Sequence, residues 1–128
     1  IRQKSSQARI RFLGYREDAA SYLKMSDIYV LPSDIEGFGN ALLEAMSTGL
    51  ICMATKTAGP SEIIKDGVNG FLVEKNEHDI TEGLIKVLSL TEEQRKVFCW
   101  NTRKFIEGNF DIEKKVAEEL STLGLNEK

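Results

Sequence analysis

Residues 27–49 read DIYVLPSDIEGFGNALLEAMSTG, and this stretch decides the fold class of the chain. Asp27–Leu31 is a short run of β-forming residues that stops at Pro32, which is typical of a buried strand. From Phe38 to Thr48 the apolar residues recur at the spacing of one helix face, and Gly49 then supplies a C-cap. The members of that face are Phe38, Ala41, Leu42, Ala45 and Met46. A strand that leads into a helix is the unit from which parallel α/β sheets are built.

The same alternation of strands and helices continues on both sides of this stretch. Upstream, Arg9–Leu13 alternates charged and apolar residues and stops at a glycine, which predicts a strand, and Asp18–Met25 has roughly helical spacing. Downstream, Leu50–Ala54 is a second buried strand. We expect a loop at Thr55–Pro60 and a single helical turn at Ser61–Lys65.

A dense group of turn-forming residues, Asp66–Gly70, precedes a third short strand at Phe71–Val73. Three helices are expected to follow. The first has Ile80, Leu84, Val87 and Leu88 on one face and is weakened by about 1 kcal/mol by Gly83; the second opens with Thr91 and Gln94 in capping-box spacing, and the third begins at Asp111.

The predicted fold class is therefore α/β, a partial Rossmann-like parallel sheet with helices on both faces and a helical C-terminus. Residues 1–128 form one unit, without an internal repeat or a linker. The first residue is Ile1 rather than methionine, which favours a fragment of a longer protein.

Composition excludes several classes of function. The formal net charge of −3 and the pI near 5.3 argue against a nucleic-acid partner, which would require a basic surface. No apolar run approaches the roughly 18 residues that cross a bilayer. Cys52 and Cys99 have neither metal-ligand nor disulfide-framework spacing, and both fit a reducing, cytoplasmic setting as small apolar residues.

The loop Pro32–Asn40 leads from the predicted strand Asp27–Leu31 into the following helix, and it carries the strongest signal for a ligand. In an open α/β sheet, ligands bind beyond the carboxyl ends of the strands. Gly37 and Gly39 permit close approach of the backbone, and the free amides at a helix start favour an anion such as phosphate. A glycine pair at a helix start is weak evidence by itself.

Two acidic residues flank these glycines. Glu44 falls off the apolar face, in line with Asn40 and roughly 9 Å along the helix from Phe38. At that distance from a diphosphate its carboxylate can accept hydrogen bonds from both ribose hydroxyls, as acidic residues do in dinucleotide folds, while Glu36 lies on the side of an attached sugar. The alternative is that Glu44 is a solvated helix residue and Glu36 complements the helix dipole. Spacing alone slightly favours this alternative.

Three stretches resemble the nucleotide-sugar domain of retaining GT-B glycosyltransferases, namely FLGY (12–15), DIYVLPSDIEGFGNALLEAMSTG (27–49) and AGPSEIIKDGVNGFLV (58–73). More narrowly, the chain resembles the group 1 or E-x7-E family, whose two acids correspond to Glu36 and Glu44, and the resemblance runs from about residue 9 to 122. It implies a C-terminal donor-binding domain that lacks its first βαβ part. The parent enzyme is then expected to transfer a hexose from a nucleotide-diphosphate sugar with retention, in polysaccharide or glycolipid biosynthesis, whereas this chain alone is inactive.

The resemblance also implies a role for each matching residue. It places Glu36 in the catalytic site as a positioning residue for donor-sugar hydroxyls, the amides of Gly37, Phe38, Gly39 and Asn40 on the distal phosphate and sugar, Glu44 on the ribose, and Tyr15 and Arg16 on the nucleobase. No metal or other cofactor is expected. The acceptor, a glycan or lipid, would bind a missing N-terminal domain of a cytoplasmic protein, peripheral at the inner membrane face.

The same resemblance implies that two central strands lie upstream of the chain, so that strand edges are exposed. We therefore expect rearrangement of the sheet or self-association. Rival functions are another GT-B enzyme, such as a nucleotide-sugar epimerase or a phosphorylase, and a flavodoxin-like regulatory or interaction module. His78 is interpreted as a solvated helix-start residue, Glu62 as a capping residue and Trp100 as a packing residue.

Overall fold

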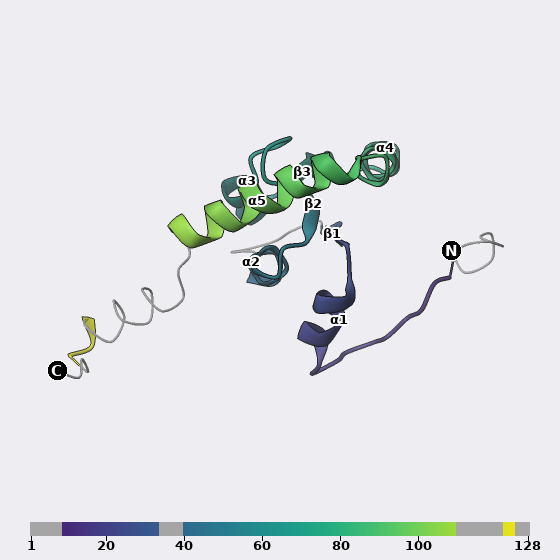
Figure 1. Ribbon diagram of the computed structural model, residues 1–128. Coiled ribbons are helices and arrows are strands. Elements are labelled where there is room, and N and C mark those ends of the chain that lie inside the picture. The colour runs from purple at the N-terminus through teal and green to yellow at the C-terminus, as the bar shows by residue number, and fades with distance from the viewer. Residues whose placement is uncertain (1–8, 34–39, 110–121, 125–128) are drawn as a thin grey trace.

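The computed structural model describes residues 9–33, 40–109 and 122–124, and it has the α/β architecture that the sequence predicts (Figure 1). The elements in chain order are α1 (Ala19–Met25), β1 (Ile28–Leu31), α2 (Asn40–Ser47), β2 (Ile51–Thr55), α3 (Ala58–Ile63), β3 (Phe71–Val73), α4 (Glu77–Leu88) and α5 (Glu92–Asn109). The helix predicted from Asp111 lies outside the described residues.

The sheet has the order β1-β2-β3, and both pairs of neighbours are parallel. Pairing begins with Ile28 opposite Ile51 and ends with Thr55 opposite Val73. Every residue of β2 is buried, because this strand has a neighbour on each side and helices above and below. The central position of β2 explains why the residues from Leu50 to Ala54 form a continuous apolar run.

Alternate residues of β2 face two separate cores. Cys52 and Ala54 pack in a cluster with α2, whereas Ile51 and Met53 pack in a second cluster with Val87 of α4. Helix α5 crosses the sheet obliquely and contributes to both clusters (Figure 1). Its Phe98 and Cys99 pack on the α4 side, and its Phe105 and Ile106 pack on the α2 side. The prediction of helices on both faces is confirmed.

Local signals at the ends of the helices are confirmed as well. Gly49 has a φ of 84° after α2, and its amide donates to the Met46 carbonyl at 3.0 Å. At the start of α5, the Thr91 amide donates to the Gln94 side chain at 2.8 Å and the Gln94 amide donates to the Thr91 hydroxyl at 3.1 Å. This reciprocal pair is a capping box, which satisfies two amides that the helix leaves without partners.

Buried polar groups tie α5 to the turn before β3. The Asn69 side chain accepts from the Lys65 amide at 2.7 Å and donates to the Ile63 carbonyl at 3.2 Å. The Thr102 hydroxyl donates to the Asn69 carbonyl at 3.0 Å, and Thr102 is 1% exposed. The turn is therefore held both internally and by the helix that packs over it.

The strand predicted at Arg9–Leu13 is wrong for the described structure, in which these residues belong to no helix or strand. Ile10 and Phe12 are 50% and 61% exposed. A strand requires a partner for its backbone groups, and among the described residues β1 pairs only with β2. Among the described residues no strand pairs with the other edge of β1, and self-association through that edge stays a prediction.

Smaller differences concern α3, α2 and α5. Helix α3 begins at Ala58, inside the predicted loop, because Pro60 is accommodated in a first turn where its missing N–H costs nothing. Ala41, expected on the buried face of α2, is exposed. Trp100, expected in the packing, is 59% exposed, because the buried face of α5 is formed by Phe98, Thr102 and their neighbours.

The buried thiol of Cys52 makes the stability of the fold sensitive to alkaline pH. Burial, and to a smaller extent the Cys99 thiol, raises the pKa of Cys52 to about 12, whereas an unfolded thiol titrates near about 8.5. The folded chain therefore keeps a proton that the unfolded chain releases. This contribution to stability is complete below about pH 8.5 and is lost as the pH rises toward the folded pKa.

We expect the free energy of unfolding to fall above about pH 8.5, and to fall less steeply in Cys52→Ala than in the wild type. Urea unfolding at a series of pH values measures both slopes. Cys99→Ala serves as the control, since it keeps the buried thiol and should retain the steeper fall. Equal slopes for Cys52→Ala and the wild type would contradict this prediction.

Candidate functional site

The carboxyl edge of the sheet is the first candidate for a ligand site. β1 ends there before Pro32 and Ser33, and β2 ends there at Thr55. A cavity of about 360 Å³ opens at this edge and is lined by Pro32, Ser33, Thr55, Lys75, Asn76, Glu77, Ile80 and Thr81. Because ligands of open α/β sheets bind beyond the carboxyl ends of the strands, this edge has the location that the sequence predicts.

A buried hydroxyl joins two strand ends at this edge. Thr55 is 2% exposed, and its Oγ1 donates to the Ser33 carbonyl at 2.6 Å. The sequence provides no local signal for this bond, since the partners are 22 positions apart and meet only through the register of β1 and β2.

Helix α2 presents two of the predicted site residues on its exposed side. Asn40 and Glu44 are both exposed, whereas Leu42, Ala45 and Met46 are fully buried. The two exposed residues are four positions apart, so they lie about 6 Å apart along the same side of the helix. Asn40 and Glu44 therefore share one exposed side of α2, and Asn40 lies at the amino end of this helix, which follows β1. Glu36, Gly37, Phe38 and Gly39 lie outside the described residues.

Tyr15 and Arg16 lie upstream of α1, in a segment that leads away from the sheet (Figure 1). Tyr15 is 91% exposed. The Arg16 guanidinium donates to both oxygens of Asp18, at 2.9 and 3.0 Å, and lies 5.4 Å from the centre of the Tyr22 ring. This ion pair lowers the pKa of Asp18 and raises the pKa of Arg16. These contacts of Arg16 are with residues at and near α1, and none of them joins Tyr15 or Arg16 to α2.

His78 has the solvated position that the sequence predicts, whereas the capping role predicted for Glu62 is wrong, because the N-cap of α3 is Thr57 and Glu62 lies near the end of that helix. The His78 side chain is 82% exposed and lies 3.2 Å from Asp79 at the start of α4. The N-cap of that helix is Asn76, whose side chain accepts from the Asp79 amide. Glu62 is exposed on α3. Among the described residues no three His, Cys, Asp or Glu side chains are grouped so that they could hold a metal ion.

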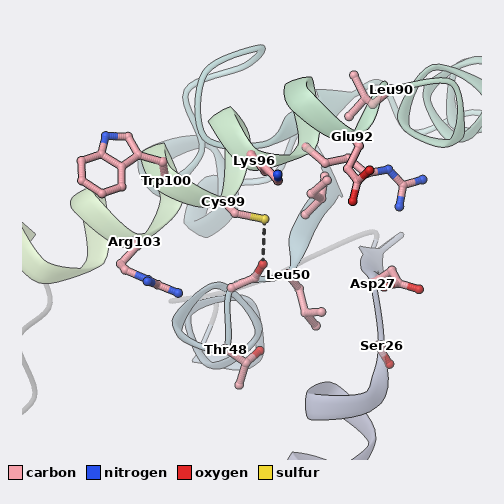
Figure 2. A pocket seen from close by; sticks show the side chains of 13 residues that line it. Ser26, Asp27, Thr48, Leu50, Leu90, Glu92, Lys96, Cys99, Trp100 and Arg103 are labelled. Atoms are coloured by element: carbon pink, nitrogen blue, oxygen red, sulfur yellow. Dashed lines mark hydrogen bonds between the residues drawn. The ribbon is translucent and has the colours of Figure 1, made fainter.

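A second cavity, of about 680 Å³, lies at the opposite end of the sheet (Figure 2). Its walls come from the amino ends of β1 and β2, the end of α2, and α5. Figure 2 shows Lys96, Cys99 and Arg103 of α5 around this space, with the Cys99 thiol donating to the Gly49 carbonyl at 3.1 Å.

The basic residues of the second cavity have a structural explanation. A helix C-terminus carries a partial negative charge, and α2 has no basic residue in its own last turn. Lys96 and Arg103 line the cavity beside that terminus. This larger cavity lies at the amino edge of the sheet. It is thus away from the carboxyl ends of the strands, where ligands of this fold class bind.

No helix within the described ranges is both long and apolar enough to span a membrane.

Comparisons with known proteins place the chain in one family. Residues 1–105 match the family described as glycosyl transferases group 1. The chain is 38% identical over 109 residues to the Escherichia coli UDP-Gal:alpha-D-GlcNAc-diphosphoundecaprenol alpha-1,3-galactosyltransferase, covering 84% of this chain and 28% of that protein. The chain thus spans less than a third of that relative.

Two solved structures show the same fold. One is the C-terminal domain of a group 1 family glycosyl transferase from Francisella tularensis, with a TM-score of 0.68 and 33% identity over 80% of this chain and 53% of that chain. The other is the Anabaena protein HepE in complex with UDP-glucose, with a TM-score of 0.75 and 29% identity over 91% of this chain and 33% of that chain. The open α/β sheet described above is therefore the sheet of a GT-B domain.

Proposed function

Since this chain belongs to the group 1 glycosyl transferases, we propose that it forms the donor-binding part of a longer enzyme that transfers a hexose from a nucleotide-diphosphate sugar with retention. The observation that carries the proposal is the exposed pair Asn40 and Glu44 on one side of α2, the helix that follows β1. The similarity to a structure that contains UDP-glucose supports a uridine diphosphate sugar as the donor.

In this proposal the donor lies across the start of α2. Glu44 accepts hydrogen bonds from the ribose hydroxyls, and the amides from Gly37 to Asn40 bind the distal phosphate and the sugar. Glu36 positions the sugar hydroxyls, and Tyr15 and Arg16 contact the nucleobase. As the bond to the sugar breaks, negative charge grows on the diphosphate, and backbone amides at a helix start stabilise such charge without a metal ion.

The rest of the reaction is assigned to parts of the longer protein. We propose that an N-terminal domain binds the acceptor, a glycan or lipid, and that this chain alone does not turn over. A cytoplasmic enzyme at the inner membrane face fits this proposal, because the E. coli relative is named for an acceptor carried on diphosphoundecaprenol.

Titration of the longer protein with UDP, GDP and ADP sugars tests this proposal. We expect a UDP sugar at about 100 times its dissociation constant to stabilise the protein by about 2.7 kcal/mol, seen as a rise in melting temperature. Uridine alone is the control, because it lacks the diphosphate. If no nucleotide sugar raises the melting temperature, donor binding is wrong; if only ADP or GDP sugars do, the choice of base is wrong.

A further inference from the structure

From the hydroxyl at the end of β2 we infer that Thr55 is a positioning residue for the donor-binding loop, an inference that rests on the function proposed above. Thr55 Oγ1 lies 2.6 Å from the Ser33 carbonyl oxygen and 3.4 Å from that of Leu31. A threonine hydroxyl has one proton to donate, and 2.6 Å is close to the usual length of a strong O–H···O bond. The bond to Ser33 is therefore the principal one.

This bond stands where backbone pairing stops. The last pair of the β1–β2 ladder is Leu31 opposite Ala54. β1 ends at Leu31, and Pro32 follows it outside the strand. The Thr55 side chain continues the connection between the two strands beyond the last backbone pair.

The position of the bond gives it a consequence for the site. The Ser33 carbonyl belongs to the peptide group that joins Ser33 to the next residue, so a bond to its oxygen fixes the direction in which the chain leaves β1. Glu36 is three residues farther along the chain, in the loop that the proposed function assigns to the donor. Thr55 itself is buried and does not need to touch the donor in order to determine where this loop begins.

A merely structural role would give a different result, and the chain offers a matched control. Thr102 is a second buried threonine whose hydroxyl donates to a backbone carbonyl, that of Asn69 at 3.0 Å. Asn69 lies before the amino end of β3, at the opposite end of the sheet from Ser33. Thr55→Val and Thr102→Val each remove a hydroxyl that donates to a backbone carbonyl. Only Thr55→Val removes the bond at Ser33, where the donor-binding loop begins.

The test measures the affinity of the longer protein for a UDP sugar by calorimetry, together with the melting temperature of each variant. Because a hydrogen bond contributes about 1 kcal/mol net, we expect Thr55→Val to raise the dissociation constant about five- to tenfold. Thr55→Ser, which keeps the hydroxyl, should restore wild-type affinity. Thr102→Val should lower the melting temperature and leave the dissociation constant unchanged.

Three outcomes would overturn the inference: wild-type affinity in Thr55→Val, equal weakening in both valine variants, or failure of Thr55→Ser to restore binding. If Thr55→Val does not fold, Thr55→Ala takes its place, since the smaller side chain cannot overpack the strand end. A wild-type protein that binds no nucleotide sugar would instead refute the proposed function, so the two failures are distinguishable.

Discussion

Replacement of Glu44 by alanine in the longer protein is expected to weaken binding of the UDP sugar by about 10- to 100-fold, because hydrogen bonds to a charged group contribute about 1.5–3 kcal/mol. The Glu44 side chain is exposed on α2 and does not belong to the buried face. Its removal should therefore leave the melting temperature of the free protein nearly unchanged. Calorimetric titration of both proteins with the same donor measures the effect.

Two controls assign the loss to the ribose. Glu93→Ala removes an equally exposed glutamate from the first turn of α5 and should bind the donor as the wild type does. A UDP sugar with 2′-deoxyribose should bind the wild type more weakly and should lose less further affinity in Glu44→Ala than the unmodified donor does, because one of the two hydroxyl partners is already absent. Full additivity of the two changes would contradict the ribose role, as would wild-type affinity in Glu44→Ala.

Gly83→Ala is expected to destabilise the fold by about 1–3 kcal/mol, through overpacking, although alanine is the better helix former by about 1 kcal/mol. An added Cβ at position 83 would lie 2.7 Å from Sδ of Met53 and 2.8 Å from Cγ1 of Val73. Both atoms belong to the sheet, so α4 would have to move away from β2 and β3. Urea unfolding of the two proteins measures the difference.

Gly108→Ala is the matched control for this prediction. Gly108 is an exposed residue of α5, and an added Cβ there meets no atom within 4 Å. The same substitution should therefore stabilise the protein by up to about 1 kcal/mol. A stabilised Gly83→Ala variant would show that α4 does not lie as close to the sheet as the structure has it.

Gly83 also illustrates what a sequence can show and what it cannot. The sequence marks this residue as a weak point of a helix, because propensity is a local property. The distance between α4 and Met53 depends on how two segments about 30 residues apart pack, which periodicity does not report. The three strands and the buried residues Leu42, Ala45 and Met46 of α2 are predictable for the opposite reason, since each depends on residues close to it in the chain.

The failure at Arg9–Leu13 has the same origin. Alternation predicts a strand there, but it is a local property, whereas pairing depends on where the fold places the segment, and the sheet of the described residues contains only β1, β2 and β3. At the candidate site, helical spacing suffices to put Asn40 and Glu44 on one side of α2. The bond from Thr55 to Ser33 is beyond such reasoning, because it requires the register of two strands to be known.

Helix α5 packs on both sides of the sheet and is bound through Thr102 to the turn before β3. As a consequence, we expect the two cores to open together when this helix detaches. Detachment of this one helix exposes Phe98 on one side and Phe105 on the other, so solvent reaches both at once. The amides of β2, which lie between the cores, are then protected by the full free energy of unfolding and not by that of either layer alone.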